Sequence, residues 1–263
     1  MAPLPFARFS LSELRSFRTG RGYSLVLCYP QFDIGELEER MHELETLGIT
    51  FIEFSGPKLV YEIPVLGKGC VGIVLIAYRQ GEKLVLKVRR TDANRSSLAW
   101  EGDCLKRANE VGVGPRFYGV TKNFLLMEYV EGTIFPEWLR NLRGKGRRER
   151  LLKVLLRALE DCFRLDNARI FHGELSSASK HILVTSQDIP RIIDFEGASL
   201  SRRASNVTAL AQYFLIGGGP SSRIRRILGF RRKEELLEAL RAYKRMRSLE
   251  FFEAIEKVLK WRQ

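Results

Sequence analysis

Apolar and polar residues follow two different periods along the chain, which predict a strand-rich first half and a helix-rich second half. Before residue 130, short runs rich in β-branched and aromatic residues are separated by turn residues, as is typical of strands. The expected strands cover residues 73–78, 84–88, 117–120 and 123–127. The expected helices, with apolar residues at helical spacing, cover residues 98–108, 151–165, 233–245 and 249–261. The pattern therefore predicts an α+β fold.

The first 56 residues predict a small strand-helix-strand unit. Residues 23–29 and 49–54 are apolar runs typical of strands, and Asp33 is expected to cap the helix between them. The apolar stripe of this helix consists of Leu37, Met41, Leu44 and Leu47. Gly48 follows where a helix C-terminal glycine is common. The unit would clamp the next lobe, bind a partner or cover a sheet edge, and the last is the simplest expectation.

Length and composition indicate a globular protein with a sizeable core. With 263 residues, 45% of them hydrophobic, the chain is long enough for two lobes and an appendage, which we divide as 1–56, 57–130 and 131–263. No apolar run is long enough to span a bilayer, and the first residues lack the pattern of a secretion signal. Four cysteines without a CxxC pair argue against a zinc site and fit reduced thiols. We expect a cytoplasmic protein without a membrane partner.

The net charge of +13 is concentrated in two short segments. The first contains Arg140, Arg143, Lys145, Arg147, Arg148 and Arg150. The second contains Arg223, Arg225, Arg226, Arg231, Arg232 and Lys233. Such clusters attract RNA, DNA or an acidic protein surface through electrostatics that do not depend on sequence. The alternative is a solvated basic face without a dedicated partner.

A glycine-rich motif precedes the most informative lysine. Gly67, Gly69, Gly72 and Val74 form a GxGxxGxV pattern, and Lys87 ends an apolar run thirteen residues after Val74. A dinucleotide-binding fold carries the same glycines just before a helix. Here the expected strand over residues 73–78 follows them, and the turn at residues 80–82 joins it to the next strand in an antiparallel hairpin. The motif therefore predicts a glycine-rich loop that covers the phosphates of ATP.

Two further segments fit an ATP site. Glu101, in the expected helix over residues 98–108, is placed to reach back toward Lys87 and hold its ammonium group against the α and β phosphates. Residues 124–132 form an apolar strand that runs into a polar segment, as an interlobe hinge does. The backbone of Glu128 to Val130 would then contact the adenine edge, with Met127 at the back of the pocket.

The second half carries His172-Gly173-Glu174 and, further along, Asp194-Phe195-Glu196. With these motifs the chain resembles the protein kinase-like superfamily over residues 60 to 215, since they correspond to its catalytic-loop HxD and metal-binding DFG. It is most similar to the compact archaeal predicted serine/threonine kinases, relatives of the RIO-type kinases and of the small kinase of the tRNA threonylcarbamoyladenosine complex. The order of the motifs matches throughout.

The resemblance implies a bilobal kinase-like fold with a β-rich N-lobe and an abbreviated helical C-lobe. It also implies transfer of the γ-phosphate of ATP, with Mg²⁺ or Mn²⁺, to a serine or threonine hydroxyl of a protein. Asp194 would bridge the metal to the β and γ phosphates, because a hard dication needs carboxylate oxygen there. His172 would be structural and would tie the catalytic loop to the segment around Asp194.

Two positions depart from the family pattern. Glu174 stands where the family has the aspartate that orients the acceptor, and its extra methylene would move the carboxylate by about 1 Å, enough for roughly a hundredfold loss. The asparagine expected five residues later is Ser179 or, if the loop carries a two-residue insertion, His181. A hydroxyl can ligate magnesium, whereas imidazole binds it weakly. Lys180 would instead neutralise the γ-phosphate, and the three alternatives stay open.

Three classes of function follow. The first is an active atypical serine/threonine protein kinase that also phosphorylates itself, and the presence of Lys87, Glu101 and Asp194 favours it. The second is a nucleotide-binding pseudokinase or ATPase switch, favoured by Glu174 and the missing asparagine. The third is a basic adaptor associated with nucleic acid that retains only the fold. Residues 199–206 are short for a segment that grips a long peptide, so we expect a folded protein, an RNA-bound protein or a small molecule as acceptor.

Overall fold

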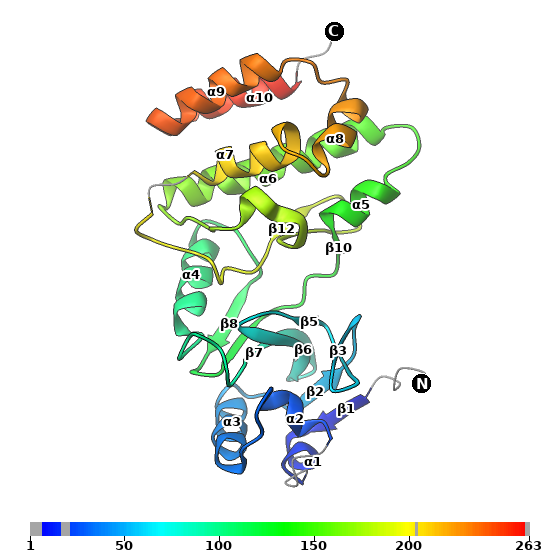
Figure 1. The fold of residues 1–263 in the computed structure, drawn as a ribbon, viewed down its shortest axis with the longest axis vertical. Coiled ribbons are helices and arrows are strands. Elements are labelled where there is room, and N and C mark those ends of the chain that lie inside the picture. The colour runs from blue at the N-terminus through cyan, green and yellow to red at the C-terminus, as the bar shows by residue number, and fades with distance from the viewer. Residues whose placement is uncertain (1–6, 17–21, 203–204, 261–263) are drawn as a thin grey trace. The chain divides into compact units, whose positions relative to one another are not determined.

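The computed structural model describes residues 7–16, 22–202 and 205–260, and these form an α+β protein (Figure 1). The chain divides into two compact units. Unit 1 comprises Met1–Asp103 and Arg116–Tyr129, and unit 2 comprises Cys104–Pro115 and Val130–Gln263. The boundary falls within helix α4 (Ala99–Glu110). None of the helices among the described residues is long and apolar enough to cross a membrane.

Unit 1 is built on a seven-stranded antiparallel sheet with the order β1-β2-β6-β7-β9-β8, in which β5 also pairs with β6. Its strands are β1 (Ala7–Ser10), β2 (Phe51–Phe54), β5 (Gly67–Lys68), β6 (Gly72–Arg79), β7 (Glu82–Arg89), β8 (Phe117–Val120) and β9 (Phe124–Glu128). A separate ladder joins β3 (Lys58–Val60) and β4 (Ile63–Val65). The predicted hairpin is confirmed, because β6 and β7 pair with Ile73 opposite Val88.

The N-terminal segment contains α1 (Leu11–Ser16), α2 (Ser24–Leu27) and α3 (Ile34–Thr46). The predicted cap of α3 is confirmed, since Asp33 Oδ1 accepts a hydrogen bond from Glu36 N at 2.8 Å. Gly48 adopts a left-handed φ of 71°, as a helix C-terminal glycine does. The predicted strand over residues 49–54 is confirmed as β2, which pairs with β6.

The strand predicted over residues 23–29 is wrong, because this run contains the one-turn helix α2. Val26, Leu27 and Cys28 are all fully buried. A short apolar run that is buried on every side carries no period that distinguishes strand from helix. The strand beside β2 is β1, which lies closer to the N-terminus. The N-terminal segment therefore extends the sheet by two strands.

The core of unit 1 joins this segment to the central strands. The apolar stripe of α3, which includes Leu37, Met41 and Leu44, is fully buried in one cluster with residues of β6 and β7 such as Leu75 and Leu86. Each such side chain contributes about 1.5–3 kcal/mol when it leaves water. Residues 34–47 therefore supply part of the core on which the strands rest.

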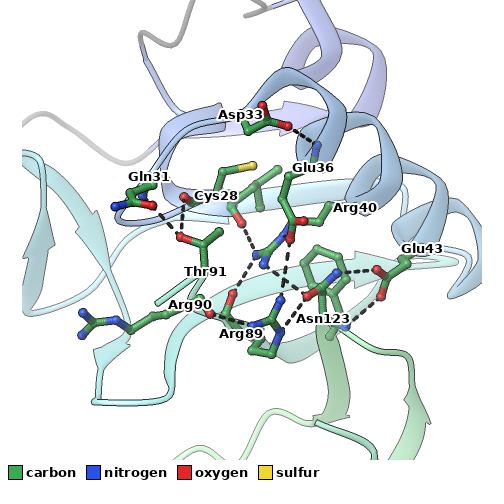
Figure 2. A network of polar contacts seen from close by, with 12 residues as sticks. Cys28, Gln31, Asp33, Glu36, Arg40, Glu43, Arg89, Arg90, Thr91 and Asn123 are labelled. Atoms are coloured by element: carbon green, nitrogen blue, oxygen red, sulfur yellow. Dashed lines mark hydrogen bonds and ion pairs between the residues drawn. The ribbon is translucent and has the colours of Figure 1, made fainter. Parts of the chain in front are cut away.

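A buried arginine adds polar contacts to this apolar packing (Figure 2). Arg40 on α3 is fully buried. Its Nε donates to Glu36 Oε1 at 2.7 Å, and its Nη1 donates to the carbonyl oxygens of Leu27 and, at 2.7 Å, of Arg89. Its Nη2 donates to Asn123 Oδ1 at 3.2 Å. One guanidinium group thereby joins α2, α3, the end of β7 and the turn before β9.

Asn123 is the second centre of the same network (Figure 2). Its Oδ1 also accepts from Arg89 Nε at 2.8 Å, and its backbone oxygen accepts from Arg89 N at 2.8 Å. Its own N and Nδ2 donate to the carboxylate of Glu43 at 2.8 and 2.6 Å. Because Arg89 lies two residues after Lys87, this network fixes the end of the strand that carries the lysine.

Unit 2 is mainly helical. Its helices are the second part of α4, then α5 (Phe135–Asn141), α6 (Arg147–Asn167), α7 (Asn206–Ala211), α8 (Ser221–Leu228), α9 (Lys233–Met246) and α10 (Leu249–Lys260). A 3-10 turn covers Leu175–Lys180 and a π turn covers Gln212–Ile216. The strands β10 (Thr133–Ile134), β11 (Ile182–Val184) and β12 (Pro190–Ile192) form a small antiparallel sheet. The long helix α6 packs against α7, α8 and α10.

Candidate functional site

The glycine motif forms a hairpin beside Lys87 in unit 1. Gly67 lies opposite Val74, and the tip closes through a 2.8 Å hydrogen bond from Gly69 N to Gly72 O. A Cβ atom on Gly72 would lie 3.1 and 3.2 Å from Lys87 Cγ and Cε and 3.0 Å from the Val88 carbonyl oxygen. The absence of a side chain at Gly72 therefore lets the glycine hairpin contact the aliphatic part of Lys87.

The predicted pair of Lys87 and Glu101 forms in the structure. Lys87 Nζ donates to Glu101 Oε1 at 2.8 Å, and the two residues are 5% and 2% exposed. A buried ion pair contributes little net stability, but removal of one partner leaves the other charge uncompensated. The pair therefore fixes the position of the Lys87 ammonium group and adds little to the stability of the fold.

The first turn of α4 is held close to the sheet at Glu101. Ser97 Oγ accepts a hydrogen bond from Ala99 N at 3.0 Å, and Leu98 N donates to the Lys122 carbonyl at 3.0 Å. A Cβ atom on Gly102 would lie 2.9 Å from the side chain of Val120 on β8, which is closer than real Cβ atoms approach. Gly102 therefore permits the approach that brings Glu101 within reach of the lysine.

The predicted hinge residues lie at the end of β9 and directly after it. Met127 pairs with Val85 of β7, and the next residue, Glu128, pairs with Leu84. The backbone N of Glu128 donates to the Arg116 carbonyl at 2.8 Å, and its carboxylate accepts from Arg116 N at 2.9 Å. Met127 and Glu128 are both partly exposed and belong to unit 1, whereas Val130 is the first residue of a segment of unit 2.

In unit 2, His172 holds the loop before Glu174 against the segment before Asp194. Its Nε2 lies 3.0 Å from the carbonyl oxygen of Ile193, and its ring packs on Phe195 with centroids 5.0 Å apart. Burial lowers the pKa of His172 to about 4, so the imidazole is neutral at pH 7 and Nε2–H donates to the carbonyl. The predicted structural contact of His172 is thus confirmed.

Gly173 and Gly197 allow these two segments to touch. Gly173 has a φ of 94°, and a Cβ atom on it would lie 2.4 Å from the carbonyl oxygen of Gly197. A Cβ atom on Gly197 would in turn lie 3.1 Å from Glu174 Cγ. The two glycines therefore make room for the glutamate side chain, which is longer than the aspartate expected at this position.

Glu174, His181 and Asp194 come together in one cluster whose candidate ligand atoms all lie within 4.8 Å of one another. His181 Nε2 lies 2.9 Å from Glu174 Oε2, and His181 Nδ1 lies 3.7 Å from Asp194 Oδ2. Asp194 has a φ of 68°, a left-handed conformation that is uncommon for residues other than glycine and is concentrated at functional sites. The cluster joins the residue before β11 to the second residue after β12.

The structure brings His181, and not Ser179, next to Asp194. Ser179 and Lys180 are exposed residues of the 3-10 turn, which carries a non-helical kink at Ser177. The additional residues of this turn place His181 directly before β11, where its carbonyl accepts from Ile193 N at 2.9 Å. Of the three alternatives left open by the sequence, the imidazole is the group that the fold supplies to the cluster.

The cluster has the donors for a divalent cation. The Nδ1 atom of His181 is buried, and among the described residues no group forms a hydrogen bond with it. An unpartnered buried nitrogen beside a carboxylate is what a metal ligand requires before the ion binds. Imidazole nitrogen suits Mn²⁺ or Zn²⁺ better than Mg²⁺, which prefers oxygen ligands. The donor set therefore fits a divalent cation that accepts nitrogen as well as oxygen ligands.

The sequence did not identify Asn206 and Asp166 as supports of this loop. Asn206 is fully buried, and its side chain accepts from His172 N at 2.9 Å and donates to the Ile170 carbonyl at 2.7 Å. Asp166 accepts from Asn206 N at 2.7 Å, and burial raises its pKa despite this bond. Asn206 is the first residue of α7, whose cap is Ser205 Oγ, which accepts from Thr208 N. In the sequence, the signal for this role would have been a polar residue, Asp166, in line with the apolar face of the helix predicted over residues 151–165.

Comparison with known proteins does not identify a family for this chain. No protein-family model matches the sequence, and no curated protein matches it. The basis for proposing a function therefore consists of the polar side chains that are fixed in each unit. These are the lysine under a glycine hairpin in unit 1 and the cluster of Glu174, His181 and Asp194 in unit 2.

Proposed function

We propose that the protein is an ATP-dependent phosphotransferase of the protein kinase type, with unit 1 as the N-lobe and unit 2 as the C-lobe of a bilobal kinase-like fold. The observation that carries the proposal is the buried pair of Lys87 and Glu101, with Nζ 2.8 Å from Oε1, beside a glycine hairpin. A fixed ammonium group beside a hairpin that has no side chains at Gly67, Gly69 and Gly72 is suited to the phosphates of a nucleotide.

The adenine would lie between Val74 of β6 and the segment from Met127 to Val130. Val74 is partly exposed on the strand that follows the glycine loop, opposite Lys87 in the ladder. Its branched side chain offers an apolar face, and the backbone after Met127 offers hydrogen-bonding groups. This part of the proposal rests on the resemblance of the motifs.

Asp194 and His181 would hold the divalent cation in unit 2. The cation would neutralise charge on the β and γ phosphates as the phosphoryl group moves. Asp194 offers carboxylate oxygen, and the buried Nδ1 of His181 offers a nitrogen ligand. Because of that nitrogen, Mn²⁺ should support a faster reaction than Mg²⁺ at equal concentration.

Glu174 would orient the acceptor hydroxyl and accept its proton. Its side chain packs against Gly197, which has no Cβ atom to obstruct the longer glutamate. Its Oε2 lies 2.9 Å from His181 Nε2, so the imidazole fixes the orientation of the carboxylate. The acceptor would be a serine or threonine of a protein, the chain's own residues included.

The test is phosphate transfer from γ-labelled ATP by the full chain, in Mn²⁺ and in Mg²⁺. Lys87→Met should remove the transfer. Lys83→Met is the matched control, because Lys83 lies on the same strand with an exposed side chain and should keep the activity. A wild-type chain without metal-dependent release of phosphate from ATP would contradict the proposal, as would equal activity in the two variants.

One observation favours a second function, a nucleotide-binding switch without transfer to an acceptor. The carboxylate of Glu174 is engaged with His181 at 2.9 Å, and this contact lowers its availability as a base. Replacing His181 with Asn distinguishes a phosphotransferase from a switch, because it removes the imidazole that contacts the Glu174 carboxylate. A chain that binds ATP and metal but transfers phosphate neither before nor after this change is a switch.

A further inference from the structure

The two arginine-rich segments, which are about eighty residues apart in the sequence, meet on the surface of unit 2. Arg223 on α8 donates its Nε to the Leu139 carbonyl at 3.2 Å and its Nη2 to the Arg140 carbonyl at 3.4 Å, both at the end of α5. Arg148 on α6 donates its Nε to the Leu228 carbonyl at the end of α8, also at 3.2 Å. Helix α8 is therefore joined to both α5 and α6 through guanidinium groups.

These contacts create an arginine patch, defined as Arg140, Arg143, Arg147, Arg148, Arg223 and Arg226. Arg140, Arg143, Arg147 and Arg226 are exposed, and the other two are partly exposed. Ion pairs form beside the patch, between Arg150 and Asp188 and between Arg232 and Glu235. Within the ranges that the structure describes, none of the six patch arginines forms an ion pair. The six guanidinium groups therefore outnumber the nearby carboxylate of Glu149, which follows Arg148 in the first turn of α6.

The arrangement is electrostatically unfavourable while no anion is bound. Partial burial and then the charges of Arg143, Arg226 and Arg147 lower the pKa of Arg223. Arg147 and Arg148 also begin α6, where the helix dipole is positive and disfavours cations. The residue before them, Gly146, has a φ of 79° and caps α6 without a side-chain hydrogen bond. An anion at this place would relieve the repulsion and accept from the free amides of the first turn.

We propose that the arginine patch binds the phosphodiester backbone of a nucleic acid. Guanidinium groups form paired hydrogen bonds with phosphate oxygens, and the patch supplies six of them. The patch arginines come from three helices and the segments beside them. A chain of phosphates is long enough to contact all of them, whereas a single small anion is not. Binding of this kind depends on charge and not on base sequence.

The absence of an apolar centre favours nucleic acid over an acidic protein. Protein interfaces are stabilised mainly by buried aromatic and aliphatic anchors. Among the described residues, the large hydrophobic side chains that are exposed are Ile34, Phe51, Leu59, Tyr61, Trp100, Ile134, Met246 and Leu249. None of these lies within residues 139–148 or 221–228, the segments that form the patch. Phosphate contacts need no such anchor.

This proposal goes beyond phosphotransfer and can be tested without ATP. The probes are a labelled single-stranded RNA, a duplex RNA and a duplex DNA of one sequence, measured by fluorescence anisotropy between about 50 and 200 mM KCl. The variant is Arg140→Ala, Arg147→Ala and Arg226→Ala together. The control is Arg107→Ala, Arg241→Ala and Arg245→Ala together, which removes three exposed arginines of α4 and α9. The control variant therefore has the same net charge as the patch variant.

The wild-type chain and the control should bind with affinities within about threefold of each other, since long-range charge alone differs little between them. The patch variant should bind at least about tenfold more weakly at low salt. The slope of log affinity against log salt should fall by about 2 for single-stranded RNA, because each lost phosphate contact removes about 0.7. The probe with the highest affinity identifies the form of nucleic acid.

Three results would overturn the proposal. One is a wild-type chain that binds none of the probes at low salt. Another is a control variant that loses as much affinity as the patch variant, since binding would then follow net charge alone. The third is competition by polyglutamate, at equal charge concentration, as strong as that by unlabelled RNA, which would identify a carboxylate-bearing partner. Thermal unfolding of both variants shows whether the fold is kept.

Discussion

Replacing Glu101 with Gln, while Lys87 remains, is expected to lower the free energy of unfolding by about 3–5 kcal/mol. The reason is the burial of the pair, whose side chains are 6% and 3% exposed with Nζ 2.8 Å from Oε1. A neutral amide is a weaker partner for the buried ammonium group than the carboxylate is. The loss is a large part of the roughly 5–15 kcal/mol that stabilises a typical domain.

The double variant Lys87→Met with Glu101→Leu separates stability from function. Two apolar side chains of similar size would occupy the same place without a buried charge. The free energy of unfolding should therefore return to within about 1 kcal/mol of the wild-type value, or exceed it. Phosphate transfer should stay absent, because no ammonium group remains beside the glycine hairpin.

Urea denaturation at pH 7 measures the stability of both variants, and γ-labelled ATP measures transfer. Lys83→Met serves as the control, since an exposed substitution on the same strand should change stability by no more than about 0.5 kcal/mol. A loss below about 1 kcal/mol in Glu101→Gln would refute the reasoning about burial. Transfer by the double variant at the wild-type rate would refute the role of the lysine.

Three further predictions concern other parts of the molecule. Gly72→Ala should raise the KM for ATP at least about tenfold, because its Cβ atom would lie 3.1 Å from Lys87 Cγ, whereas Gly218→Ala, with no atom within 4 Å, should leave it unchanged. Arg40→Met should lower the free energy of unfolding by about 3 kcal/mol or more, because it removes the buried donor to the Leu27 and Arg89 carbonyls; an unchanged urea midpoint would contradict the network in Figure 2. Burial raises the pKa of Asp161 from 3.8 to about 6, so its ionisation destabilises the fold as the pH rises through that range, and Asp161→Asn should gain about 3 kcal/mol relative to wild type between pH 3.5 and 7.5. Equal pH dependence of urea unfolding in wild type and Asp161→Asn would rule this out.

Local patterns predicted the elements that carry the proposed nucleotide site. The turn at residues 80–82 and the β-branched runs around it were enough for the hairpin of β6 and β7. Asp33 and Gly48 marked the ends of α3 for the same reason, since capping is a property of a few adjacent residues. The pairing of Lys87 with Glu101 was also predictable, because a single strand-to-helix connection separates them.

The features that the sequence did not predict depend on residues that are distant in the chain. The contacts of Arg40 with Arg89 and Asn123 join three segments, and no local period indicates them. The choice of His181 over Ser179 depended on the length and kink of a 3-10 turn, which sequence spacing alone left open. The two arginine segments were visible separately, but their meeting depends on how α8 packs against α5 and α6.

The central proposal is that Lys87 and Asp194 are both needed for the metal-dependent binding of ATP. The measurement that tests it most directly is thermal unfolding with ATP and with adenosine, each with and without Mn²⁺, on wild type, Lys87→Met and Asp194→Ala. We predict that ATP with metal stabilises the wild-type chain, that adenosine does so much less, and that either substitution removes the metal-dependent part. If ATP with metal stabilised Asp194→Ala as strongly as wild type, Asp194 would not be needed and the proposal would be wrong.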